Sequence, residues 1–282
     1  MKAITLCKWS LCHVLTSKKS LFVLGMMAMF TYILLSPIVA IARHFDLRLT
    51  PLAYPLLVND MTAHLMLLSG YIFLLAMIDQ NNISLQPVLP RASYGSAAAG
   101  QLLSITILPL LYQLMMTALS QVWLLGVTDW HIAWGDGWIF LTDPVRTIDF
   151  HKVFLPDGFL LHTYTPIDTL WKTYLSEWAL LILLGLVSTA LNKLSGMALG
   201  TFTAMGIAVT DILFYSMFPI PLRILSPVSL AMLSTFQEPE RASGVTQEYA
   251  FVFFPLVLIV LGAAYMYVNM IWIRKRKKGC LL

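Results

Sequence analysis

The chain has 282 residues, of which 59% are hydrophobic and only 11% are charged, and its mean hydropathy is +0.78. This composition, together with uncharged runs of membrane length, indicates a polytopic membrane protein and argues against a water-soluble enzyme. The net charge of +4 comes mainly from a basic tail, which suits an anionic inner leaflet better than nucleic acid. We therefore expect membrane lipids, and no nucleic acid, among its partners.

The first 20 residues place Ile4, Cys7 and Leu11 at helical spacing among four lysines. This pattern predicts an amphipathic helix that lies on the cytoplasmic membrane surface. A cleaved signal peptide is the alternative, but no small-residue cleavage site follows the apolar stretch cleanly. We expect residues 1–20 to form a cytoplasmic interfacial helix ahead of a single transmembrane domain, residues 21–282.

Six apolar segments of this domain are predicted to span the membrane, because about 20 apolar residues cross a hydrocarbon core of roughly 30 Å as a helix. The last segment, Phe251 to Ile273, is uncharged, and the next five residues, Arg274 to Lys278, are all basic. Basic residues beside a span stay in the cytoplasm, which puts the C-terminus and, with six spans, also the N-terminus inside. The predicted fold is an all-α polytopic membrane protein with both termini cytoplasmic. The spans are expected near residues 21–41, 62–78, 97–127, 173–194, 198–219 and 251–273.

The charge distribution agrees with this topology. The inner segments hold eleven Lys and Arg residues and a single acid, Asp79, and an excess of inner basic residues is what membrane insertion requires. The three cysteines, Cys7, Cys12 and Cys280, all fall in segments predicted to be cytoplasmic. No structural disulfide is therefore expected.

The predicted outer loop, residues 128–172, is rich in turn residues, acids and aromatics. Trp130, Trp134 and Trp138 recur every four residues, which predicts three indoles on one side of a helix at the outer interface, although two glycines weaken that helix. We interpret these tryptophans as outer interfacial anchors, with a ligand-stacking surface as the alternative. Glu177 is assigned to the same outer boundary.

A second outer segment, residues 220–248, contains the apolar stretch 228–236, which is too short to span. This pattern predicts a short re-entrant or interfacial helix before the last span. Such helices persist at membrane depth only when they are buried against protein or line a cavity. The segment therefore hints at a pathway.

Asp211 lies well inside the predicted fifth span, where an unpaired carboxylate costs about 2.5 to 3.5 kcal/mol. Small residues recur every four positions ahead of it, at Gly196, Gly200, Ala204 and Ala208. Such a stripe allows another helix to approach closely. Two interpretations stay open: an interface or pathway face between subunits, or packing within the chain's own bundle with Asp211 bonded to a neighbour.

Motifs for metal binding or nucleotide hydrolysis are not found. The histidines are scattered, so no zinc site is expected, and His64 is interpreted as a packed or snorkelling residue. Residues 95–102 have the glycine spacing of a phosphate-binding loop, but Gln101 stands at the lysine position and Leu102 at the hydroxyl position. The chain is not expected to be an enzyme, and any energy source must come from another protein.

This layout is similar to that of the permease subunits of type-two ATP-binding cassette exporters, in which a basic amphipathic helix precedes six spans with both ends inside. The stretch Leu89–Ser93, leading into Gly100 and Gln101, resembles the segment by which such permeases enter their third span after a cytoplasmic coupling helix. The resemblance covers nearly the whole chain. The long outer loop departs from the compact members and leaves the substrate class open.

The resemblance implies a translocation route in a bacterial plasma membrane. A second copy or a homologous permease would complete the route, and cytoplasmic ATPase subunits would bind ATP and Mg²⁺, so no cofactor is expected on this chain. The ATPase would act through the inner loop at Gln86, Arg91, Ser93 and Ser96. In that family the first and fifth spans flank the central route, which would give the face from residue 196 to residue 211 a purpose.

Two other function classes stay in view. The chain could be a stand-alone polytopic protein, such as an immunity or sensor component that binds a peptide or lipid at its outer loops without transport. It could also be an enzyme acting on lipids, for which the outer acids Asp129, Asp136, Asp143 and Asp149 would serve. A soluble ATPase encoded next to this chain would favour the exporter over both.

Overall fold

The computed structural model describes residues 3–80, 93–130, 133–142, 156–195, 198–217, 226–236 and 246–279. These residues fold into helices and turns, and the described part of the chain holds no strand beyond one isolated bridge between Leu49 and Thr128. The predicted all-α fold is confirmed. In chain order the helices are α1 (Ala3–Thr16), α2 (Lys18–His44), α3 (Ala53–Val58), α4 (Met61–Gln80), α5 (Tyr94–Leu124), α6 (Gly135–Leu141), α7 (Gly158–Thr163), α8 (Pro166–Ser195), α9 (Leu199–Met217), α10 (Pro227–Ala231), the 3₁₀ helix η3 (Leu233–Phe236) and α11 (Gln247–Gly279).

Within the ranges that the structure describes, four helices are long and apolar enough to cross a membrane, as expected of a multi-pass membrane protein. They are Lys18–His44, Gly95–Leu124, Pro166–Ser195 and Gln247–Trp272, in α2, α5, α8 and α11. The other two predicted spans correspond to α4 and α9, whose apolar stretches Met61–Met77 and Leu199–Thr210 are shorter. Four candidate spans are thus present, and two further apolar helices pack beside them.

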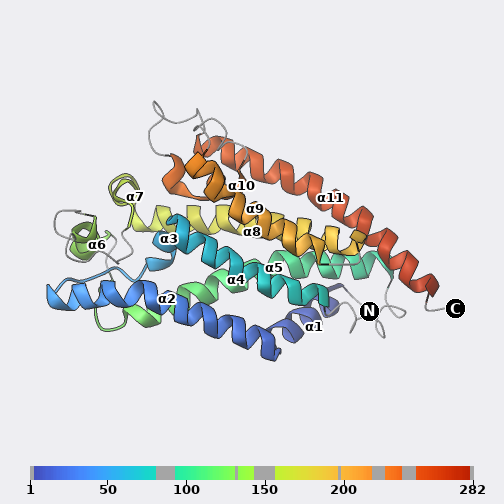
Figure 1. The fold of residues 1–282 in the computed structure, drawn as a ribbon, viewed down its shortest axis with the longest axis horizontal. Coiled ribbons are helices and arrows are strands. Elements are labelled where there is room, and N and C mark those ends of the chain that lie inside the picture. The colour runs from blue at the N-terminus through green and yellow to red at the C-terminus, as the bar shows by residue number, and fades with distance from the viewer. Residues whose placement is uncertain are drawn as a thin grey trace.

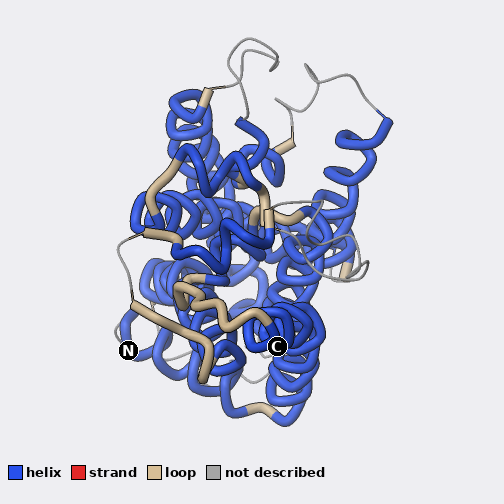
Figure 2. The backbone as a smooth tube through the Cα atoms, turned by 90° about the vertical axis from the view of Figure 1, so that its left-hand side faces the viewer, coloured by secondary structure: helices blue, strands red, loops and turns tan. Residues whose placement is uncertain are grey.

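Helix α8 is the central element of the bundle. It contacts α4, α5, α9, α10 and α11, and 67% of its apolar window is buried, compared with 11% for α11. Figure 2 shows the helices side by side in a view turned 90° from that of Figure 1. The apolar part of α8 is therefore enclosed by protein, whereas that of α11 is mostly exposed.

The short helices and the chain ends lie at opposite ends of the bundle (Figure 1). Helices α3, α6, α7 and α10 gather at one end, which we call the α6 end. Helix α1 and the last turns of α11 lie at the other, the α1 end. The basic run 274–278 is at the α1 end, so the distribution of charge along the bundle is asymmetric.

The predicted N-terminal helix is present as α1 and packs across the start of α5. Ser17 separates α1 from α2 with an extended backbone, and its side chain accepts a hydrogen bond from the Ser20 N–H at 3.1 Å. Gly100 on α5 permits the close approach, since a Cβ there would lie 2.9 Å from the Ala3 carbonyl oxygen and 2.9 Å from Leu6 Cβ. The apolar side of α1 is thus fixed against α5, and Lys8 is exposed.

Helix α8 begins seven residues before the predicted start of the fourth span. Pro166 occupies its first turn, where the missing N–H costs nothing, and the Thr165 hydroxyl accepts a hydrogen bond from the Asp168 N–H at 3.2 Å. The Thr165 hydroxyl also donates to the Asp168 carboxylate at 2.7 Å. This reciprocal cap starts the helix inside the stretch that was predicted to be loop.

The apolar part of the second outer segment forms α10 and η3. The Ser226 side chain caps α10, whose residues Val228, Leu230 and Ala231 are buried. The predicted short helix before the last span is therefore found, and it is packed against protein, chiefly α8.

Candidate functional site

A carboxylate and an imidazole meet inside the bundle. His64 Nε2 lies 2.8 Å from Glu177 Oε2, and each side chain is only 1% exposed. His64 is in the first turn of α4, which Asp60 starts by accepting a hydrogen bond from the Ala63 N–H at 2.8 Å. Glu177 lies on the central helix α8. Ionisable groups held at this depth between apolar helices are expensive to bury, and they mark candidate functional sites.

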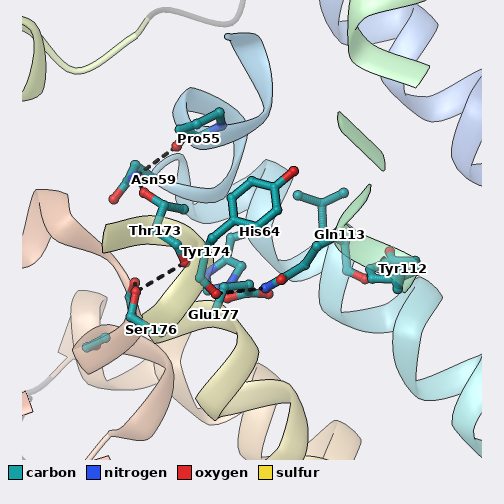
Figure 3. Close-up of polar contacts among 12 residues, drawn as sticks. Pro55, Asn59, His64, Tyr112, Gln113, Thr173, Tyr174, Ser176 and Glu177 are labelled. Carbon is teal, nitrogen blue, oxygen red and sulfur yellow. Dashed lines mark hydrogen bonds and ion pairs between the residues drawn. The ribbon is translucent and has the colours of Figure 1, made fainter. Parts of the chain in front are cut away.

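Polar residues join this pair to the α6 end of the bundle (Figure 3). The Asn59 amide donates to the Pro55 carbonyl at 2.7 Å and to the Thr173 hydroxyl at 3.3 Å. Asn59 Oδ1 accepts a hydrogen bond from the Ser234 N–H at 3.1 Å. Helices α3, α8 and η3 are therefore tied together beside the His64–Glu177 pair.

Helix α5 closes the cluster from the other side. Gln113 Nε2 donates to the Tyr174 carbonyl at 3.3 Å, one turn before Glu177, and Figure 3 shows the Gln113 side chain extending toward the His64–Glu177 pair. The Tyr112 hydroxyl donates to the Leu67 carbonyl on α4 at 2.6 Å. Side chains of α4, α5 and α8 thus enclose the pair.

Three buried polar atoms of this region have no hydrogen-bond partner among the described residues: His64 Nδ1, Gln113 Oε1 and the Tyr71 hydroxyl. Buried polar groups are nearly always satisfied, so such atoms call for an explanation. On α3, outside the spanning helices, burial raises the pKa of the Tyr54 phenol well above its usual range, and the charge of Glu177 raises it further. Tyr54 therefore stays protonated and neutral beside the cluster.

A second polar cluster lies at the α1 end. Lys193 on α8 donates to Gln101 Oε1 at 2.6 Å, to Asn269 Oδ1 at 2.8 Å and to the Tyr265 hydroxyl at 3.1 Å. Its ammonium also lies 5.4 Å from the ring centre of Trp272. This cluster connects α5, α8 and α11 through one cation.

Comparison with known proteins identifies no relative. No protein-family model, curated protein or solved structure matches this chain. Its function must therefore be argued from its own residues.

The three tryptophans predicted to be outer interfacial anchors lie in different environments. Trp130 is 74% exposed, whereas Trp134 and Trp138 are buried. The Trp134 indole donates to the Tyr164 carbonyl at 2.8 Å and the Trp138 indole to the Thr50 carbonyl at 2.9 Å. The three do not share one helix, because α6 begins only at Gly135. Two of the indoles hold the loops of the α6 end together.

Glu177, which was assigned to the outer boundary, is buried inside the bundle. The early start of α8 puts it eleven residues into that helix, where it is buried against His64. His64 is a packed residue, as predicted, but the sequence did not indicate its carboxylate partner. The two residues are 113 positions apart, and no local pattern links them.

The small-residue stripe faces the chain's own bundle where it is described. Ala204 and Ala208 are buried, and the Gly200 backbone lies directly against the Ser188 carbonyl of α8. Gly196 and the side chain of Asp211 lie outside the described residues. Packing within the bundle therefore accounts for the three described stripe positions.

The predicted coupling residues are described only in part. Ser93 caps α5 by accepting a hydrogen bond from the Ser96 N–H at 3.2 Å, which explains both serines structurally. Gln86 and Arg91 lie outside the described residues, as do the outer acids Asp143 and Asp149.

An open cavity of about 750 Å³ lies at the α6 end. It is lined by Asp46, Leu47, Arg48, Asp129, Trp130, Ala133, Gly135 and Asp136. Two of the acids considered for an enzyme therefore share one cavity. Within the described ranges, no three His, Cys, Asp or Glu side chains come together as a metal site.

Proposed function

We propose that this chain is the membrane-spanning subunit of an ATP-driven exporter. In this proposal it has six spans, namely the four long helices with α4 and α9, and both termini are in the cytoplasm. A second permease copy or a homologous permease completes the route in a bacterial plasma membrane. A separate cytoplasmic ATPase subunit binds ATP and Mg²⁺ and acts through the inner loop.

The observation that carries this proposal is the contact between α1 and the start of α5. Helix α5 follows directly after the inner loop, and the close approach at Gly100 joins its first turns to α1. Leu6 of α1 packs in one apolar cluster with Ala97 and Ala98 of α5. A push on the inner loop would therefore move α5 and the surface helix as one unit, which is the type of coupling that a permease without its own motor needs.

The distribution of charge supports the proposed orientation. The α1 end holds the basic run 274–278 together with Lys8, Lys18 and Lys193, and basic residues beside spans stay in the cytoplasm. At the α6 end lie Asp46, Asp129 and Asp136, which line the open cavity. This end would face outward.

The test is co-isolation of the ATPase. The tagged chain, purified from native membranes in mild detergent, is expected to bring down an ATP-binding cassette subunit and to hydrolyse ATP once reconstituted with it. Gly100→Val is expected to lower that hydrolysis, because its side chain would separate α1 from α5. Gly262→Val on α11 is the matched control, since a Cβ at Gly262 meets no atom within 4 Å. Failure to isolate any ATPase would contradict the proposal.

A stand-alone binding protein is the second candidate, and the open cavity at the α6 end favours it. Trp130 and Arg48 line that cavity beside three acids, so both aromatic and charged groups are available to a peptide or lipid. If the chain is a stand-alone binding protein, it purifies without an ATPase and retains a bound peptide or lipid. The same co-isolation experiment therefore separates the two candidates.

A further inference from the structure

The His64 ring is bonded on one side only. Its Nε2 faces the Glu177 carboxylate at 2.8 Å, while Nδ1 is buried and has no partner among the described residues. When Glu177 is ionised, Nε2 must carry a hydrogen to donate to it. The Nδ1 atom then holds a lone pair and can accept a proton without breaking any hydrogen bond that the described residues make.

A second unpartnered atom lies in the same cluster. Gln113 Oε1 is a buried acceptor, and its amide nitrogen is held by the Tyr174 carbonyl, one turn before Glu177. Two acceptors, Nδ1 and Oε1, can be satisfied together by one water molecule that donates to both. When Nδ1 gains a proton it becomes a donor, and the same water can accept from it and still donate to Oε1.

Protonation of His64 changes the net charge of the pair. With neutral His64 and ionised Glu177 the pair carries one negative charge among apolar helices, and such a charge is costly to bury. Forming an N–H bond at Nδ1 turns the ring into an imidazolium and makes the pair neutral overall.

The titratable groups on the surrounding elements leave this charge unbalanced. Those nearest the pair are the phenols of Tyr54, Tyr71, Tyr112 and Tyr174, and the described side chains of α9, α10 and η3 include no titratable group. The other charged groups lie elsewhere: Asp60 caps α4, Asp168 is in the first turn of α8, Lys172 lies over the Tyr164 ring, and Lys193 binds Gln101. No described cation from these elements reaches Glu177 in place of His64.

The cluster is close to the α6 end. Asp60, which is partly exposed, precedes His64 by four residues, or about 6 Å along a helix. Asn59 and Thr173 continue the polar groups between that surface and the pair. The pair is therefore bordered by polar groups on the side that faces the α6 end.

We propose that His64, Glu177 and Gln113 form a hydrated proton-binding site, in which His64 Nδ1 takes up a proton through a bound water that Gln113 Oε1 holds. The site does not depend on the proposed transport function, and it would operate equally in a stand-alone membrane protein.

Solid-state ¹⁵N NMR of the full chain in lipid bilayers tests this, because it distinguishes protonated from unprotonated ring nitrogens. The other five histidines are replaced by Asn so that only His64 reports. When the pH is lowered from about 8 to about 5, Nδ1 is expected to change from unprotonated to protonated while Nε2 keeps its hydrogen. A water contact to Nδ1 is expected at both values. An Nδ1 signal that stays unchanged over this range would overturn the proposal.

Two matched variants locate the water. Gln113→Leu keeps the size of the side chain but removes Oε1, and we expect loss of the water contact and a proton affinity at Nδ1 lower by about tenfold, the value of one hydrogen bond. Tyr71→Phe removes the other unpartnered oxygen. That hydroxyl lies beside Gly185 of α8, eight residues beyond Glu177, at 3.4 Å from the position that a Cβ of Gly185 would take. This variant should leave both readouts unchanged. An equal effect of the two variants would contradict the assignment to Gln113.

Discussion

The ammonium group of Lys193 donates a 2.8 Å hydrogen bond to Asn269 Oδ1, and this bond joins α8 to α11. Helix α11 is otherwise the least enclosed of the long helices. Asn269 is fully buried, so the amide needs a partner inside the protein. Lys193 therefore fixes α11 to α8 at the α1 end, in addition to the apolar packing of Tyr265.

Lys193→Met is expected to lower the free energy of unfolding by about 1 to 3 kcal/mol, because it removes the donor from a buried amide oxygen. Thermal unfolding in detergent micelles measures the change. Lys8→Met is the control, since Lys8 is exposed on α1 and its replacement should alter stability by no more than about 0.5 kcal/mol. Equal effects at the two positions would contradict a structural role for Lys193.

Gly200→Ala is expected to destabilise the bundle by about 1 to 3 kcal/mol through overpacking. A Cβ at Gly200 would clash with the Ser188 carbonyl oxygen and lie 2.9 Å from Asn192 Oδ1, which accepts the Gly200 N–H at 2.6 Å. Gly206→Ala on the same helix is the matched control. A Cβ there meets no atom within 4 Å, so the change should be neutral or stabilise by up to about 1 kcal/mol. Chemical unfolding of both variants in one detergent gives the comparison.

The helical elements could be predicted from the sequence because long apolar runs and amphipathic spacing are local signals. Helix α8 starts before the predicted span because the charged residues Asp168 and Lys172 interrupt the apolar run, and the stretch that holds them is predicted to be loop. The local sequence signal for this helix start is the cap formed by Thr165, Pro166 and Asp168. A helix that starts at this cap carries Glu177 into the bundle.

The candidate site could not be predicted in the same way. Its polar residues come from α3, α4, α5 and α8, and only packing brings His64 to Glu177. The tryptophan repeat predicted one interfacial helix, and this prediction was wrong for a related reason. Gly137 lies against the Arg48 carbonyl oxygen, which would be 2.5 Å from a Cβ, so the chain there packs on a distant loop and forms no long interfacial helix.

His64→Leu is expected to cost about 3 to 5 kcal/mol of stability, because it leaves Glu177 buried without its partner. Glu177→Leu should cost less, about 1 to 3 kcal/mol, because it leaves a neutral imidazole without its hydrogen-bond partner. The double variant should cost clearly less than the two single costs added together, since it leaves no uncompensated charge. Unfolding of the four proteins completes the cycle, and strictly additive costs would mean that the two side chains do not interact.

Labelling from outside the cell should reach the α6 end and not the α1 end. Trp130 is 74% exposed at the α6 end, and Cys12 is exposed on α1, so both positions are accessible to a reagent that can reach them. We expect Trp130→Cys, in a chain whose own cysteines are replaced by Ser, to react with a membrane-impermeant maleimide in intact cells. A chain that keeps only Cys12 should react after permeabilisation alone, because the proposed topology places the basic α1 end in the cytoplasm. The reverse pattern would invert the topology.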